Sequence, residues 1–152
     1  MTFIRRFAAI TTALLVSPLA VDIALAGGDI TVTGAWARPS LGQTGVTALY
    51  LTLKNNGPQP DELLSVTTPL AKVSELHSSR VENGVVTMQP IGRLPLSPGQ
   101  TVVFEPKGNH VMLMMLSRPL TAGEHLALEL RFAFHAPESA EAVIAIAPPP
   151  QP

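Results

Sequence analysis

The 152-residue sequence contains no cysteine. This absence excludes disulfide scaffolds, thiolate zinc sites, cysteine catalysis and attachment of a lipid to a cysteine. Charged residues make up only 14% of the chain and the formal net charge is −1, which argues against nucleic acid as a partner because its binding depends on clustered Lys and Arg. Long apolar runs are also missing, since none reaches the roughly 20 residues that a membrane-spanning helix requires.

The N-terminus has the pattern of a secretory signal peptide. Arg5 and Arg6 precede an apolar run over residues 7–16, and Ala24-Leu25-Ala26 supplies the small-x-small pattern of a signal-peptidase site. We therefore expect residues 1–26 to be cleaved during export to the periplasm, with no stable membrane insertion afterwards.

The remaining chain is predicted to form one all-β domain over residues 27–147, which is long enough to bury a core without disulfides. Apolar and polar side chains alternate in short segments separated by Gly, Pro and Asn, a pattern typical of an antiparallel sandwich or barrel. Residues 136–143 are expected to form at most a short turn of helix, and the Pro-rich residues 148–152 a mobile tail. Strands are expected at residues 30–36, 47–54, 61–67, 71–78, 84–91, 101–105, 110–116, 126–134 and 142–147.

Four residues stand out as candidate metal ligands: His77, Met88, His110 and Met112. Ten residues separate the first pair, twenty-one the middle pair and one the last pair. Neutral imidazole and thioether donors together favour a soft or borderline ion, and Cu(I) above all. A site without thiols suits a compartment outside the reducing cytosol.

A hairpin turn explains how the first two candidates could meet. Asn83-Gly84 is a strong signal for a two-residue turn, because both residues tolerate positive φ. Such a turn would place Ser79 opposite Met88, which makes His77 a diagonal neighbour of Met88 with Cβ atoms roughly 7–8 Å apart.

The second pair needs no turn. His110 and Met112 are two residues apart on an expected strand, so they share a face, with Cα atoms about 6.6 Å apart. Two strand segments that each offer one imidazole and one thioether can enclose a single four-coordinate Cu(I) ion, whose filled d shell has no preference for a square plane.

The other histidines and methionines are expected to have ordinary structural roles. Met114 shares a face with the proposed ligands and could line the site, whereas Met115 points the other way. His125 follows an apparent turn and is expected to be solvated, and His135 is expected to be structural or exposed.

The chain resembles the PCuAC family of periplasmic copper chaperones, whose signature is His, ten residues, Met, twenty-one residues, His, one residue, Met. His77, Met88, His110 and Met112 match it without insertion or deletion. The resemblance extends from about residue 30 to residue 134 and includes Ala35-Trp36-Ala37-Arg38-Pro39, Glu75-Leu76-His77 and His110-Val111-Met112-Leu113-Met114.

The resemblance implies a cupredoxin-like Greek-key β-sandwich or barrel that binds one Cu(I) ion. It also implies delivery of copper towards cytochrome c oxidase assembly, with the oxidase's second subunit and its dinuclear copper centre, or a Sco-type thiol copper protein, as partners. Some members carry a His- and Met-rich C-terminal extension that binds more copper. This chain has neither residue after His135, which predicts a single copper site.

The expected mechanism is ligand exchange, and we expect no enzymatic activity. Histidine ligands must be unprotonated, so Cu(I) binding should weaken below about pH 6.5. The missing cysteine argues against an electron-transfer blue-copper protein, because such a site needs a cysteine thiolate. A hydrolase or oxidase has little support, because four protein ligands leave no open position for a substrate. One alternative stays open, a copper-buffering or resistance protein that uses the same site without a dedicated acceptor.

Overall fold

The computed structural model describes residues 29–40 and 45–150, so the expected signal peptide lies outside the described residues. These residues form ten strands. Within the described ranges there is no helix of the length and apolar character needed to cross a membrane. The strands are β1 (Ile30–Ala37), β2 (Thr47–Asn55), β3 (Asp61–Thr67), β4 (Ala71–Glu82), β5 (Val85–Pro90), β6 (Leu94–Leu96), β7 (Thr101–Val103), β8 (Asn109–Leu116), β9 (His125–Phe132) and β10 (Glu138–Ile144).

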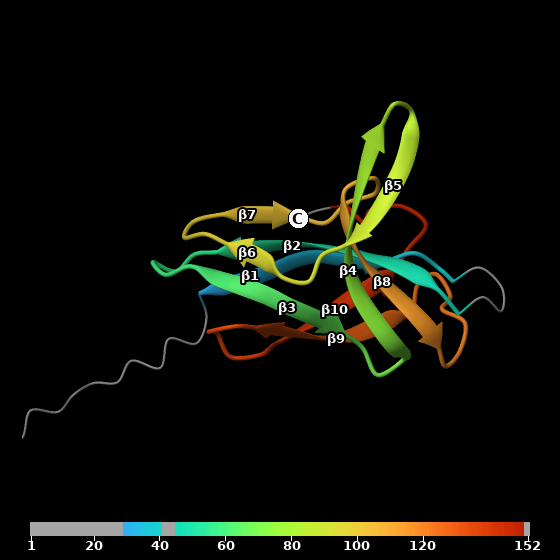
Figure 1. Cartoon of the computed structure of the whole chain (residues 1–152). Helices are drawn as coiled ribbons and strands as arrows, with labels where there is room; N and C mark the ends of the chain where they lie inside the picture. Colours follow the sequence, from blue (N-terminus) through green and yellow to red (C-terminus); the bar gives the residue numbers. More distant parts are fainter. Residues whose placement is uncertain (1–28, 41–44, 151–152) are drawn as a thin grey trace, which may run out of the picture.

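The strands join into one hydrogen-bonded sheet that folds over on itself. Its order is β5-β4-β8-β2-β1-β10-β9-β3-β6, and β7 pairs with β2 beside this path. Figure 1 shows β1 and β2 above β9 and β10, and β3 also packs against β4, which brings the two ends of the sheet order together. This arrangement confirms the predicted all-β sandwich.

One face of the strands forms the hydrophobic core. Leu76 of β4 and Val111 and Leu113 of β8 are almost completely buried in it, together with leucines from β2, β3 and β9. Because side chains alternate along a strand, the residues between them on β4 and β8 point to the other face of the sheet. This second face is therefore available for side chains that serve a purpose other than core packing.

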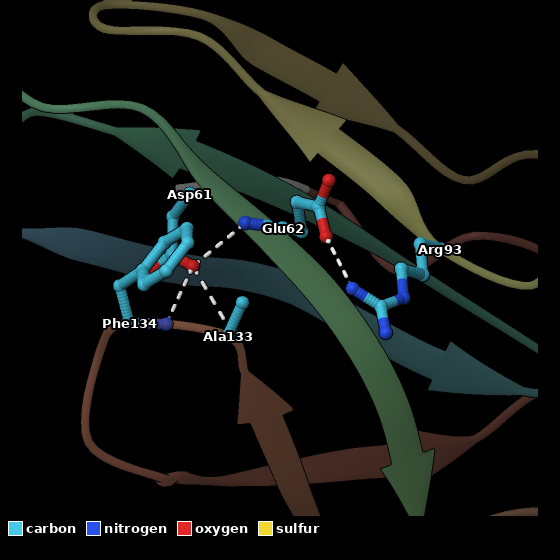
Figure 2. Close-up of polar contacts among 5 residues, drawn as sticks. All are labelled: Asp61, Glu62, Arg93, Ala133 and Phe134. Atoms are coloured by element: carbon cyan, nitrogen blue, oxygen red, sulfur yellow. Dashed lines mark hydrogen bonds and ion pairs between the residues drawn. The ribbon is translucent and has the colours of Figure 1, made fainter.

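A buried carboxylate fixes the segment after β9 to the start of β3. Figure 2 shows Oδ1 of Asp61 accepting hydrogen bonds from the backbone N–H groups of Glu62, Ala133 and Phe134, at 2.6, 3.1 and 3.0 Å. The neighbouring Glu62 pairs with Arg93 at 3.2 Å on the surface. Asp61 thereby ties the backbone of Ala133 and Phe134 to the first residue of β3.

The structure differs from the expected elements at residues 136–147 and at residues 94–96. Residues 138–144 form β10 rather than a helical turn followed by a strand at 142–147, and β6 was not expected at all. The Ala- and Glu-rich sequence of β10 favours a helix locally, but pairing with β9 on one side and β1 on the other decides its conformation. The β1–β10 pair is parallel, which is possible because no hairpin joins these two distant strands.

β4 continues to Glu82, four residues beyond the expected end at residue 78, and, β10 apart, the other boundaries differ from the expected ones by at most two residues. Residues 148–150 form no strand, as expected of the Pro-rich tail, and residues 151–152 lie outside the described part.

Candidate metal centre

The β4–β5 hairpin has the register that the sequence predicted. Asn83 and Gly84 form the two-residue turn with φ values of 52° and 80°, and Ser79 pairs with Met88. His77 lies two residues before Ser79 on β4, on the side away from the turn, and pairs with Pro90. Met88 and His77 are therefore diagonal neighbours on one face. Figure 1 shows this hairpin rising from the body of the domain.

The two histidines face each other across neighbouring strands. His77 of β4 is directly opposite His110 of β8, and their ring centroids are 5.7 Å apart at an interplanar angle of 62°. Metal–nitrogen bonds of about 2 Å each would span this separation if both rings turned a nitrogen towards a shared ion. This direct pairing is closer than the sequence alone indicated.

The two methionines lie on either side of the histidine pair. Met112 is two residues beyond His110 on the same face of β8 and is partly buried, opposite Glu75 of β4. Met88 lies on the hairpin, and 59% of its surface is exposed. The structure therefore brings His77, His110 and Met112 together on the body of the sheet, with Met88 as the outermost candidate.

Hydrogen bonding defines which nitrogen of His110 is free. Nδ1 of His110 is 3.1 Å from the carbonyl oxygen of Gly108, which also accepts a hydrogen bond from the N–H of Ser79. A carbonyl oxygen only accepts, so Nδ1 carries the proton and Nε2 keeps its lone pair. Because His110 is buried, with 5% of its surface exposed, its ring is held in this orientation.

His77 has the opposite arrangement. Its Nε2 lies 3.0 Å from Oε2 of Glu75, whereas its Nδ1 is buried and has no hydrogen-bond partner. A buried polar atom without a partner is unusual in a folded protein, and a water, an ion or another ligand can satisfy it. This atom is the feature of the described structure that best fits a bound metal. The sequence reasoning missed Glu75, although its position two residues before His77 on the same strand was a usable signal.

The donor set decides which metal fits. Within the described ranges, no group of three or more His, Cys, Asp or Glu side chains could hold a metal ion. The same face also carries the thioether sulfurs of Met88 and Met112, a donor type that favours Cu(I) over zinc or a hard cation.

An aromatic pair occupies the adjoining part of the same face. Ala48 of β2 pairs with Met112, and Tyr50 follows two residues later and pairs with Trp36 of β1. The two rings are 4.6 Å apart between centroids and are almost completely buried. Burial raises the pKa of Tyr50, and the nearby Arg38 guanidinium partly offsets this. The second face of the sheet is thus packed beside Met112.

The other histidines and methionines behave largely as the sequence predicted. Met114 shares the face of Met112, and Met115 is 57% exposed at the end of β8 with a φ of 54°. His125 is exposed and pairs with Glu141 on β10. His135 is structural, with its side chain 8% exposed and its Nε2 within 3.2 Å of Glu138.

The domain has the fold of a PCuAC domain. The apo PCuAC domain from PmoF1 matches with a TM-score of 0.67 over 80% of this chain and 97% of its own, at 22% identity, a level that shows the fold alone. The solution structure of CuI-DR1885 from Deinococcus radiodurans is 30% identical, with a TM-score of 0.64 over 84% of this chain and 85% of its own.

The sequence comparisons agree with the fold. A family model described as "Putative lipoprotein LpqE-like" matches residues 30–144, and the chain belongs to this LpqE-like family, the PCuAC family. A relative named "Putative lipoprotein Lxx21020", from Leifsonia xyli subsp. xyli (strain CTCB07), is 34% identical over 107 residues. That match covers 68% of this chain and 62% of the relative, so the chain spans less than two thirds of the relative's length. The family resemblance read from the sequence is confirmed.

Proposed function

We propose that the protein is a periplasmic copper chaperone that binds one Cu(I) ion through His77, Met88, His110 and Met112. The observation that carries this proposal is the pair of facing imidazoles, one with a buried, unpartnered nitrogen, on a face that also carries two thioethers. The 30% identity to DR1885, whose structure was solved as CuI-DR1885, supports Cu(I) as the ion.

The chemistry of these donors favours release as well as binding. Thioethers are soft and neutral, and they need no deprotonation before they bind a metal. An acceptor with cysteine thiolates provides stronger, anionic ligands for Cu(I), so copper would pass to it by exchange of one ligand at a time. This role is transfer rather than catalysis.

We further propose the direction of this transfer and its compartment. The acceptors that fit are the second subunit of cytochrome c oxidase, with its dinuclear copper centre, and a Sco-type thiol copper protein. The signal-peptide pattern over residues 1–26 and the lipoprotein names of the family and of its Leifsonia relative support export to the periplasm.

X-ray absorption of the Cu(I)-loaded protein tests the site. We expect sulfur and nitrogen scattering in the wild type, and reduced sulfur scattering in Met88→Ala and in Met112→Ala. Met115→Ala is the matched control, because this methionine is exposed at the end of the same strand as Met112 and should leave the spectrum unchanged. A wild-type spectrum with only nitrogen and oxygen ligands would show that the proposed site is wrong.

A transfer assay tests the role. The Cu(I)-loaded protein is mixed with a thiol-bearing acceptor domain, and copper is measured in each protein after separation. Movement of copper to the acceptor supports a chaperone. Retention of copper against a thiolate acceptor would instead favour the buffering role that uses the same site.

A further inference from the structure

We infer that Glu75 is a positioning residue that directs His77 to bind copper through Nδ1, whereas His110 binds through Nε2. This inference rests on the proposed function and adds the coordinating atom of each ring together with a residue outside the ligand set. It is drawn from the hydrogen bonds of the two imidazoles, which differ in which ring nitrogen is occupied.

Glu75 is well placed to act on His77. The two residues are on β4, two positions apart and therefore on one face, and Oε2 of Glu75 is 3.0 Å from Nε2 of His77. A carboxylate oxygen only accepts hydrogen bonds, so the contact requires a proton on Nε2. Glu75 therefore selects the tautomer of His77.

The other ring nitrogen of His77, Nδ1, is buried and has no hydrogen-bond partner. A proton on this atom would be a buried donor without an acceptor, which is unfavourable, so Nδ1 keeps its lone pair. The atom that is free to bind an ion is also the atom that lacks any other partner.

His110 presents the opposite nitrogen, because the Gly108 carbonyl occupies its Nδ1. The two rings thus offer unlike nitrogens across a centroid separation of 5.7 Å. Partners of this kind fix the tautomer and ring orientation of metal-binding histidines and raise their basicity.

Glu75 is suited to positioning rather than to direct coordination. Half of its side chain is exposed, so its pairing with His77 is screened by water and adds little to the stability of the fold. Carboxylate oxygen is a hard donor and competes poorly with imidazole and thioether for Cu(I). Its replacement should therefore change copper binding without unfolding the domain.

The tautomers can be read directly in the copper-free protein. Long-range ¹H–¹⁵N correlation spectra should show the proton of His77 on Nε2 and that of His110 on Nδ1. Glu75→Ala should give a mixture of tautomers at His77 and leave His110 unchanged. Glu75→Gln should keep the wild-type tautomer, because its amide carbonyl still accepts a hydrogen bond from Nε2.

Copper binding is then measured by competition with a chromophoric Cu(I) chelator. We expect Glu75→Ala to weaken Cu(I) affinity by about 10–100-fold, the usual effect of losing such a partner. Glu75→Gln should recover most of this loss. Glu82→Ala is the matched control, because it removes the same charge from the exposed end of the same strand and should change the affinity less than about threefold.

The outcomes separate this inference from the proposed function. A wild-type protein that binds no Cu(I) overturns the proposed function, and the ligation assigned to Nδ1 with it. Cu(I) binding together with a proton on Nδ1 of His77 in the copper-free protein overturns the inference alone. The inference alone also fails if Glu75→Ala keeps both the wild-type tautomer and the wild-type affinity.

Discussion

Replacement of Asp61 by alanine is expected to destabilise the domain strongly. Oδ1 of Asp61 accepts three backbone hydrogen bonds, and only 7% of this residue is exposed (Figure 2). In the alanine variant the N–H of Ala133 keeps its bond to the carbonyl of Glu62, at 3.0 Å, but the N–H groups of Glu62 and Phe134 lose their acceptor. A hydrogen bond to a charged group contributes about 1.5–3 kcal/mol, so the loss of these two bonds predicts a decrease of about 3–6 kcal/mol in the free energy of unfolding.

In urea denaturation, this loss should appear as a lower urea concentration at the midpoint of unfolding. The dependence of the unfolding free energy on urea concentration should stay unchanged. Asp61→Asn keeps an oxygen acceptor without its charge, so it should fall between the wild type and Asp61→Ala. Glu62→Ala is the control, because it breaks only the exposed ion pair with Arg93 and should cost less than about 1 kcal/mol. A free energy of unfolding for Asp61→Ala within about 1 kcal/mol of the wild type would refute the reasoning.

Three further predictions concern the core, the hairpin and the response to alkali. Leu113→Ala, at a fully buried position next to Met112, should lower the free energy of unfolding by about 2–5 kcal/mol in urea denaturation. Gly84→Ala places a side chain in open space but at a φ of 80°, which costs about 1–2 kcal/mol of conformational strain. This strain should speed amide exchange in β5 about tenfold. Gly92→Ala is the control, because Gly92 also faces open space but has no positive φ, so amide exchange in β5 should stay unchanged. Burial raises the pKa of Tyr50, the only tyrosine, so the unfolded chain loses this proton at a lower pH than the folded protein does. Stability should therefore fall as the pH rises above about 10, and comparison with Tyr50→Phe, which lacks this contribution, isolates it.

Local sequence signals predicted the hairpin and its register. Asn83 and Gly84 specify a two-residue turn by their own backbone preferences, and the pairing of Ser79 with Met88 follows from the turn without help from the rest of the chain. The same kind of local reasoning failed for β10. Its alanines and glutamates suit a helix, and only pairing with β9 and β1 makes this segment a strand.

The arrangement of the candidate ligands was predictable in part. The shared face of His110 and Met112 follows from strand periodicity. The direct pairing of His77 with His110 does not, because it depends on the register between β4 and β8, and 32 residues lie between these two histidines in the chain. The partnership of Glu75 with His77 depends on side-chain rotamers and became visible only with the structure.

The projecting hairpin has a consequence for the kinetics of the proposed site. Among the strands that the structure describes, β5 is an edge strand and pairs with β4 alone. Val81, Val85 and Val86 are exposed on the hairpin together with Met88. The other three proposed ligands belong to strands that also build the core. Loss of the hydrogen bonds between β4 and β5 would thus detach the sulfur of Met88 while the sandwich stays folded. Segments with few buried contacts open far more often than a whole domain unfolds. The lifetime of bound copper would then be set by the opening of this hairpin and could be tuned by its turn residues, independently of the melting temperature.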